Sequence, residues 1–83
     1  MILAIDIGNT SIALGGFEGD ELRFVVRLST DATKTEDEYA SKIMNILNLH
    51  KVTRENVEGA IISSVVPPLN SIMKNAISLA YEV

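Results

Sequence analysis

The sequence predicts a mixed α/β domain with the element order β-β-β-α-β-α, and three observations indicate this fold class. Short runs of apolar and β-branched residues dominate the start of the chain. A helix-capping pattern then opens a stretch of helical periodicity, and a Pro-Pro pair opens a second such stretch after one more apolar run. The crossover between the third and fourth strands is long enough to hold a helix, which allows parallel pairing within a mixed sheet.

The first three strands are expected to form a meander. Residues 2–7 make an apolar run that ends at Gly8-Asn9-Thr10, and residues 11–17 resume a strand, so the short turn predicts an antiparallel hairpin. A second turn at residues 18–20 leads to a third strand over residues 22–28. The Gly15-Gly16 pair lacks the G-x-G-x-x-G spacing and indicates a bulge or a close contact between strands.

Two helices and a fourth strand follow. Thr35 and Glu38 form a capping box, and the helix behind them carries one apolar stripe of Tyr39, Ile43, Ile46 and Leu47. Residues 60–62 are predicted to be a strand buried on both faces of the sheet. A second helix is expected to start at Pro67-Pro68 and to run to the chain end, with apolar positions at Leu69, Ile72, Met73, Ala76, Ile77 and Ala80. Because no Gly, Asn or Pro follows it, we expect that the sequence is cut here or continues into a further strand.

Composition limits the function classes. The chain has 83 residues, a net charge of −4 and no cysteine, so it is one small domain or part of one, without disulfides or thiolate metal sites. An acidic surface argues against nucleic-acid binding, and phosphate binding must then depend on backbone N–H groups, a metal ion or another part of the protein. No apolar run reaches the about 20 residues that span a membrane, and no signal peptide is recognisable, so a cytoplasmic protein is expected.

The turn after the first strand holds the candidate chemistry. Asp6 interrupts an apolar strand, and a buried carboxylate there would need a metal, a cation or several hydrogen-bond donors. Gly8 allows close approach of the backbone, the N–H groups of Asn9 and Thr10 can face phosphate oxygens, and Asp6 can orient Mg²⁺ through water. Alternatively, Asp6 and Asn9 simply form an Asx-type turn between two strands. These residues alone leave both interpretations open.

The motif Asp6-Ile7-Gly8-Asn9-Thr10, in this order of elements, resembles the first phosphate-binding loop of the superfamily of acetate and sugar kinases, Hsp70 and actin. Within that superfamily the chain is most similar to type III pantothenate kinase. The similarity continues through residues 27–30 (Arg-Leu-Ser-Thr), 35–39 (Thr-Glu-Asp-Glu-Tyr) and 61–68 (Ile-Ile-Ser-Ser-Val-Val-Pro-Pro). The resemblance implies that residues 1–83 are the N-terminal part of a first ribonuclease H-like, actin-like ATPase half-domain, truncated before its last strand and helix.

The resemblance also implies an activity: transfer of the ATP γ-phosphate to pantothenate, the first committed step to coenzyme A, with Mg²⁺ and a monovalent cation, K⁺ or NH4⁺. A homodimer of the full-length protein is implied as well. Asp6 would be the metal-site residue, and the loop that binds the nucleotide would comprise Asp6, Ile7, Gly8, Asn9, Thr10, Ser11, Ile12 and Ala13. The family's Gly-x-Asp-Arg segment, which supplies the catalytic base, is absent, as is the second half-domain. We therefore expect no catalytic residue in these 83 residues and no activity from them alone.

Two other functions are considered: a non-catalytic accessory factor in transcription with the same fold, and an actin-like assembly, which the Ser-Ser-Val-Val-Pro-Pro block disfavours. Structural roles are favoured for the remaining polar residues. We expect Ser63 and Ser64 to cap or line the entry of the second helix, Arg27 to form a surface ion pair, and His50 to interact with the C-terminal end of the first helix. Met44 and Met73 are expected to fill the core.

Overall fold

The computed structural model describes residues 1–83, and its elements follow the predicted order. Strands β1 (Ile2–Ile7), β2 (Ser11–Glu18) and β3 (Glu21–Ser29) precede helix α1 (Glu36–Leu49), strand β4 (Gly59–Ser64) and helix α2 (Asn70–Tyr81). The four strands form one sheet in the order β3-β2-β1-β4. β1 is antiparallel to β2 and parallel to β4, which confirms both the hairpin and the mixed sheet.

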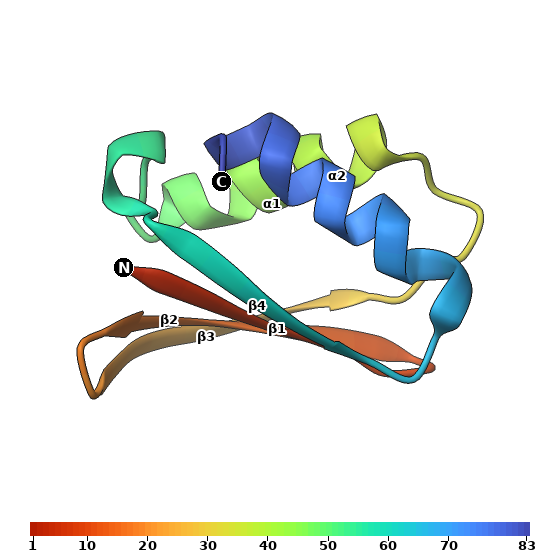
Figure 1. Cartoon of the computed structure of the whole chain (residues 1–83), viewed down its shortest axis with the longest axis horizontal. Coiled ribbons are helices and arrows are strands. Elements are labelled where there is room, and N and C mark those ends of the chain that lie inside the picture. The colour runs from red at the N-terminus through yellow and green to blue at the C-terminus, as the bar shows by residue number, and fades with distance from the viewer.

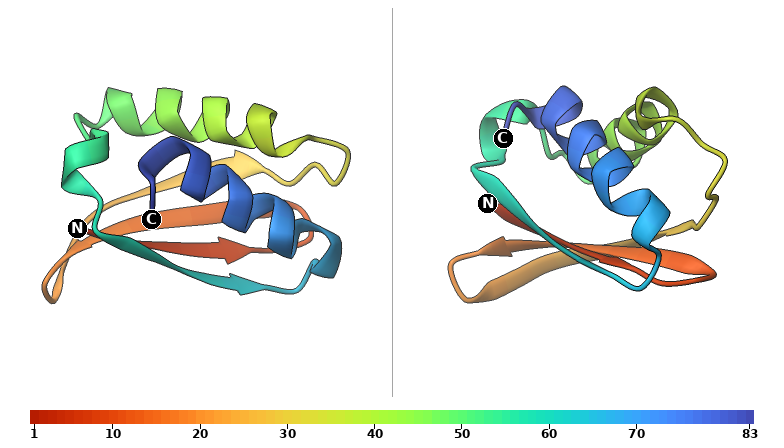
Figure 2. Two further views of the ribbon diagram at one scale, coloured as in Figure 1. Left: turned by 45° about the horizontal axis from the view of Figure 1, so that its top comes forward. Right: turned by 45° about the vertical axis from the view of Figure 1, so that its right-hand side comes forward.

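Both helices pack on the same face of the sheet and leave the other face uncovered (Figures 1 and 2). The alternation along the strands follows from this arrangement: in β1, Leu3, Ile5 and Ile7 are buried beneath the helices, whereas Asp6 is exposed. The prediction that residues 60–62 are buried on both faces is wrong. The side chain of Ile61 is 67% exposed, because it lies on the face that has no helix.

A capping box and a pair of prolines determine how the two helices begin. The Thr35 hydroxyl accepts a hydrogen bond from the Glu38 N–H at 3.2 Å, and a Glu38 carboxylate oxygen accepts one from the Thr35 N–H at 2.9 Å, which confirms the capping box. These bonds hold the pKa of Glu38 below its usual value. The second helix begins later than predicted, because Pro67–Leu69 form a 3-10 turn first. The two prolines have no N–H to donate, so the first bond of this segment runs from the Leu69 N–H to the Val66 carbonyl.

Gly16 marks the predicted irregularity in the sheet. The pairing of β2 with β3 shifts register between Gly16 and Phe17, and a Cβ atom at Gly16 would collide with the ring of Phe24. Phe24 in turn stacks on His50, which follows α1, with ring centroids 5.4 Å apart. The bulge and the close contact are thus both confirmed, and they attach the start of β3 to the end of α1.

The buried hydroxyl of Tyr81 leads to a first prediction. Tyr81 is 4% exposed and its hydroxyl has no hydrogen-bond partner, and burial raises its pKa to about 12. Replacing Tyr81 with Phe removes an unsatisfied buried group, so we expect the free energy of unfolding of this chain to rise by about 1 kcal/mol. The Tyr81 hydroxyl loses its proton near pH 10 in the unfolded chain but only near pH 12 in the folded chain. The free energy of unfolding should therefore fall as the pH rises from about 10 to 12, and Tyr81→Phe should remove this fall.

Tyr39 provides the matched control. Its buried hydroxyl donates to the Asp31 carbonyl at 2.7 Å and accepts from the Asp31 N–H at 2.8 Å. Tyr39→Phe should therefore lower the free energy of unfolding by about 1–3 kcal/mol. Chemical denaturation of both variants at pH 7 and pH 11 measures the contrast. Equal destabilisation by the two substitutions would show that the Tyr81 hydroxyl has a partner after all.

Candidate functional site

The turn between β1 and β2 presents backbone donors that have no partner within the chain. Asn9 and Thr10 lie outside the strands and are exposed, and neither of their N–H groups donates a hydrogen bond to another residue. Four carbonyl groups around them are occupied, whereas the Asn9 carbonyl accepts no bond within the chain. The Ile7 carbonyl accepts a hydrogen bond from the Val65 N–H, and the Ser11 carbonyl accepts one from the Gly8 N–H. Thr30 donates to the other two, through its hydroxyl to the Gly8 carbonyl and through its N–H to the Thr10 carbonyl. Because most of its acceptors are occupied and two of its donors are free, the turn favours an anion.

Thr30 braces this turn from the end of β3. Its hydroxyl donates to the Gly8 carbonyl at 2.7 Å, and its N–H donates to the Thr10 carbonyl at 3.0 Å. The Gly8 N–H closes the turn by donating to the Ser11 carbonyl at 3.0 Å. A Cβ atom at Gly8 would lie 3.0 Å from that same oxygen, so a larger residue would open the turn. The sequence places Thr30 in a family-like block whose residues can help to shape the loop, and the two hydrogen bonds show how Thr30 does so.

Asp6 does not lie where the sequence argument placed it. The carboxylate is exposed on the uncovered face of the sheet rather than buried, because its strand neighbours Ile5 and Ile7 point toward the helices. It forms no ion pair, and neither Asp6 nor Asn9 makes a side-chain hydrogen bond, so the Asx-type turn is not formed. The expectation of a buried, compensated carboxylate is wrong for this chain. Asp6 is instead free to face a ligand on the open side.

The other residues of the predicted loop divide between two faces. The side chains of Ile7 and Ile12 are fully buried beneath the helices, so only their backbones are near the turn. Ala13 pairs with Asp6 across the sheet and lies on the uncovered face, and the Ser11 hydroxyl makes no hydrogen bond. The loop is therefore brought together at one end of the sheet, with Asp6, Asn9, Thr10 and Ser11 able to present polar atoms.

A shallow depression of about 280 Å³ lies on the uncovered face and has Asp6 at one end. Ser63 of β4 pairs with Asp6 in the parallel register and also lines the depression. The rest of its lining is mainly apolar, with Ala4, Phe17, Leu22, Val25 and Ile61. Leu22 is 48% exposed and Val25 51% exposed. Asp6, Ser63 and the turn therefore form a polar margin beside an uncovered apolar surface.

The predictions for the neighbouring polar residues have different outcomes. The Ser64 hydroxyl accepts from the Val66 N–H at 3.0 Å, which confirms its role at the entry to the Pro67 turn, whereas Ser63 faces Asp6 instead. The ion pair expected for Arg27 is absent, since this exposed side chain has no acidic partner. Met73 is fully buried and Met44 packs against the core, as expected. His50 is the C-cap residue of α1, but its side chain stacks on Phe24 and makes no hydrogen bond to the helix.

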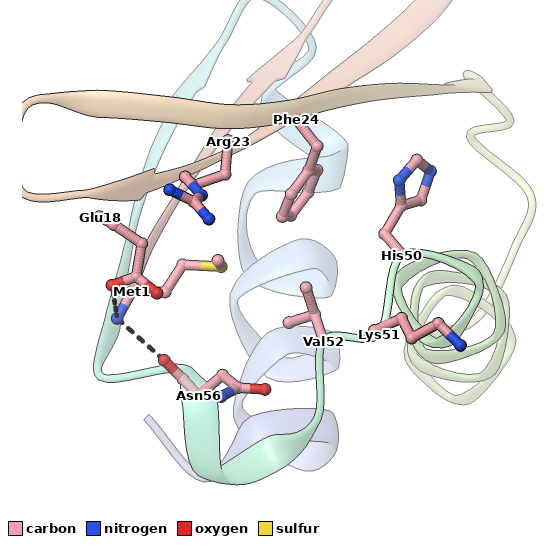
Figure 3. A pocket seen from close by; sticks show the side chains of 8 residues that line it. All are labelled: Met1, Glu18, Arg23, Phe24, His50, Lys51, Val52 and Asn56. Atoms are coloured by element: carbon pink, nitrogen blue, oxygen red, sulfur yellow. Dashed lines mark hydrogen bonds and ion pairs between the residues drawn. The ribbon is translucent and has the colours of Figure 1, made fainter.

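A second concavity, of about 300 Å³, lies at the opposite end of the sheet (Figure 3). Apart from Lys51, its charged groups already have partners. The Met1 ammonium contacts the Asn56 carbonyl at 2.9 Å and the Glu58 carboxylate at 3.1 Å, and Arg23 contacts Glu21 at 3.2 Å. His50 stacks on Phe24, and Lys51 points away from the hollow in Figure 3. This arrangement explains the packing of the N-terminus and offers a ligand few free groups.

No three side chains of the types that bind metals lie together as a site, and no helix has the length and apolar character needed to cross a membrane. In the register of the sheet, Asp6 pairs with Ser63 and Ala13, and Ala13 pairs with Arg27. Asp6 is the one carboxylate in this row of four residues, so a divalent cation near the turn would meet a single carboxylate there.

The strand order, the crossover helix and the turn after β1 are consistent with a truncated half-domain of the actin-like class. A family model described as type III pantothenate kinase matches residues 2–83, and the chain belongs to that family. It is 54% identical over 70 residues to the type III pantothenate kinase of Brevibacillus brevis, which covers 84% of this chain and 28% of that protein. The corresponding protein of Finegoldia magna is 48% identical over 77 residues, 93% of this chain and 29% of that protein. The chain thus spans just over a quarter of the length of these curated relatives.

The brace at Thr30 leads to a second prediction. Thr30→Val keeps the shape of the side chain but removes the hydroxyl that binds the Gly8 carbonyl, so the free energy of unfolding should fall by about 1 kcal/mol. The amide protons of Gly8 and Thr30, which close the turn, should exchange faster with solvent. Thr30→Ser keeps the hydroxyl and serves as the control. Unchanged exchange at Gly8 in Thr30→Val, measured by NMR, would contradict the brace.

Proposed function

We propose that the full-length protein phosphorylates pantothenate with ATP, the first step of coenzyme A biosynthesis, and that this chain supplies the loop for the nucleotide phosphates. The observation that carries the proposal is the match of residues 2–83 to type III pantothenate kinases, in a chain whose turn holds two free N–H donors. Phosphoryl transfer depends mainly on positioning and on electrostatic stabilisation of the phosphate oxygens. Donors fixed by the core of a sheet serve both purposes.

Each part of the turn has a proposed role. The N–H groups of Asn9 and Thr10 bind phosphate oxygens, and the hydroxyls of Thr10 and Ser11 add neutral donors. Gly8 keeps the turn tight, because its N–H and the Ser11 carbonyl are 3.0 Å apart. Ile7, Ile12 and Ala13 take part through their backbones and set the register. No residue near the turn is assigned the proton transfer from the pantothenate hydroxyl, which we place in the remainder of the protein.

Asp6 fits a magnesium ion that stays largely hydrated. Mg²⁺ commonly binds one or two carboxylates together with substrate phosphates and keeps several waters, and Asp6 is an exposed, unpaired carboxylate two residues before the turn. When bound, the ion offsets negative charge on the phosphates. The monovalent cation, the homodimer and the cytoplasmic location stay predictions of the family resemblance.

We also propose that the remainder of the same protein covers the open face of the sheet. The exposed apolar side chains there, Leu22, Val25 and Ile61, adjoin the polar margin at Asp6. The curated relatives are more than three times as long as the matched region, so further chain is available to cover this surface. A cover over the apolar part would exclude water from the margin and strengthen the electrostatic interactions of the turn. The alternative function in transcription has no observation in its favour.

The role of Asp6 is tested in the full-length protein. Asp6→Asn removes the charge at nearly unchanged size, and we expect kcat/KM for ATP to fall roughly 10- to 100-fold, as for other groups that orient a metal through water. Asp20→Asn is the control, because Asp20 is also exposed but lies in the turn between β2 and β3, at the far end of the sheet. ATP-dependent phosphorylation of pantothenate is measured for both. An Asp6→Asn enzyme as active as Asp20→Asn would refute the proposed role.

The 83-residue chain alone is expected to be inactive. It lacks a general base at the turn, and its donors face water, so both proton transfer and stabilisation of the transition state are missing. Formation of phosphopantothenate by the purified chain and by the full-length protein is compared at equal concentration. Turnover by the short chain at a rate near that of the full-length protein would show that the site is complete within residues 1–83.

A further inference from the structure

Arg27 belongs to a block of residues that resembles the family, but the resemblance assigns no function to its side chain. The register of the sheet aligns four residues in one row that crosses all the strands: Ser63 pairs with Asp6, Asp6 with Ala13, and Ala13 with Arg27. The strand neighbours of Arg27, Val26 and Leu28, are buried beneath the helices. Arg27 therefore belongs to the uncovered face, on the same side as Asp6.

The spacing within this row allows Arg27 to reach a ligand held beside Asp6. Neighbouring strands lie about 4.8 Å apart, so the backbones of Asp6 and Arg27 are about 10 Å apart. Only the methyl group of Ala13 stands between them. A long arginine side chain can lie over this small residue, and a phosphate group fits between a carboxylate-bound cation on one side and a guanidinium on the other.

Arg27 is also without a partner in the chain. It is exposed and forms no ion pair or side-chain hydrogen bond. Lys34, the next basic residue along the chain, lies 3.8 Å from Asp31, and Arg23 pairs with Glu21 at the other end of β3. The two hydrogen bonds of Thr30 fix the end of β3 against the turn, so Arg27 is held at a constant place relative to the free N–H groups.

A positive side chain at this margin favours phosphate binding on electrostatic grounds, in addition to the charge that Mg²⁺ would supply. The chain has a net charge of −4, Asp6 is itself negative, and the turn offers the phosphates only neutral donors. We propose that Arg27 is a nucleotide-positioning residue, whose guanidinium binds the phosphate chain of ATP across Ala13 from Asp6. This inference rests on the proposed function for the nature of the ligand. Arginine suits the role, because its planar fork can bind two phosphate oxygens at once.

Binding of MgATP and of pantothenate to the full-length protein, each measured by calorimetry, tests the proposal without depending on catalysis. A charge-assisted hydrogen bond is lost in Arg27→Ala, so we expect the Kd for MgATP to rise about tenfold or more, with the Kd for pantothenate unchanged. Arg27→Lys should recover part of the affinity, since it restores the charge but not the bidentate geometry. The affinity of Arg27→Ala should also depend less on salt concentration.

Arg23→Ala is the matched control, because it removes the same side chain from the same strand at the end that is remote from the turn. Thermal unfolding verifies that each variant is folded. Equal MgATP affinity in the wild type and Arg27→Ala would overturn the proposal, as would a loss confined to pantothenate. If the wild type binds MgATP but does not phosphorylate pantothenate, the proposed function fails while the role of Arg27 still stands on the binding data.

Discussion

The register of β1 in the centre of the sheet is the constraint on which the rest of the structure depends. Leu3, Ile5 and Ile7 point beneath the helices, and each fully buried side chain of this kind contributes about 1.5–3 kcal/mol. A slip by one residue would expose all three and bury Asp6 without a partner. The core therefore fixes the carboxylate on the open face, and the pairing with β2 and β4 fixes its neighbours Ala13 and Ser63. Packing on one side determines the arrangement of the polar groups on the other.

The turn after β1 depends on contacts that are remote in sequence. Val65 and Thr30, which bind the carbonyls of Ile7, Gly8 and Thr10, come from the end of β4 and the end of β3. Because these carbonyls are satisfied from within the protein, the turn cannot easily rotate its peptides to present oxygens to solvent. In the turn, the N–H groups of Asn9 and Thr10 and the Asn9 carbonyl remain without a partner in the chain. Such donors, fixed before a ligand arrives, stabilise negative charge at little cost of reorganisation.

Local signals in the sequence predicted much of this, and the misses have physical causes. The capping box at Thr35, the bulge at Gly16 and the hairpin at Gly8 are specified by neighbouring residues, so the sequence could reveal them. The exposure of Ile61 and Asp6 depends on which face the helices cover, and an apolar run looks the same for one-sided and two-sided burial. The row from Ser63 to Arg27 requires the pairing of all four strands. No single segment contains that information.

The exposed turn and the uncovered face of the sheet would both be stabilised if the same segment covered them. Two backbone donors facing water gain little from binding a phosphate, because water binds both partners nearly as well. The same donors become effective in a site of low dielectric, from which water is excluded. Leu22, Val25 and Ile61 need cover for a separate reason, since an apolar surface of this kind is stabilised by burial. If one segment of a longer protein packs on these side chains, it also forms a wall beside Asp6, and folding of the whole protein then assembles the proposed phosphate site in the same step.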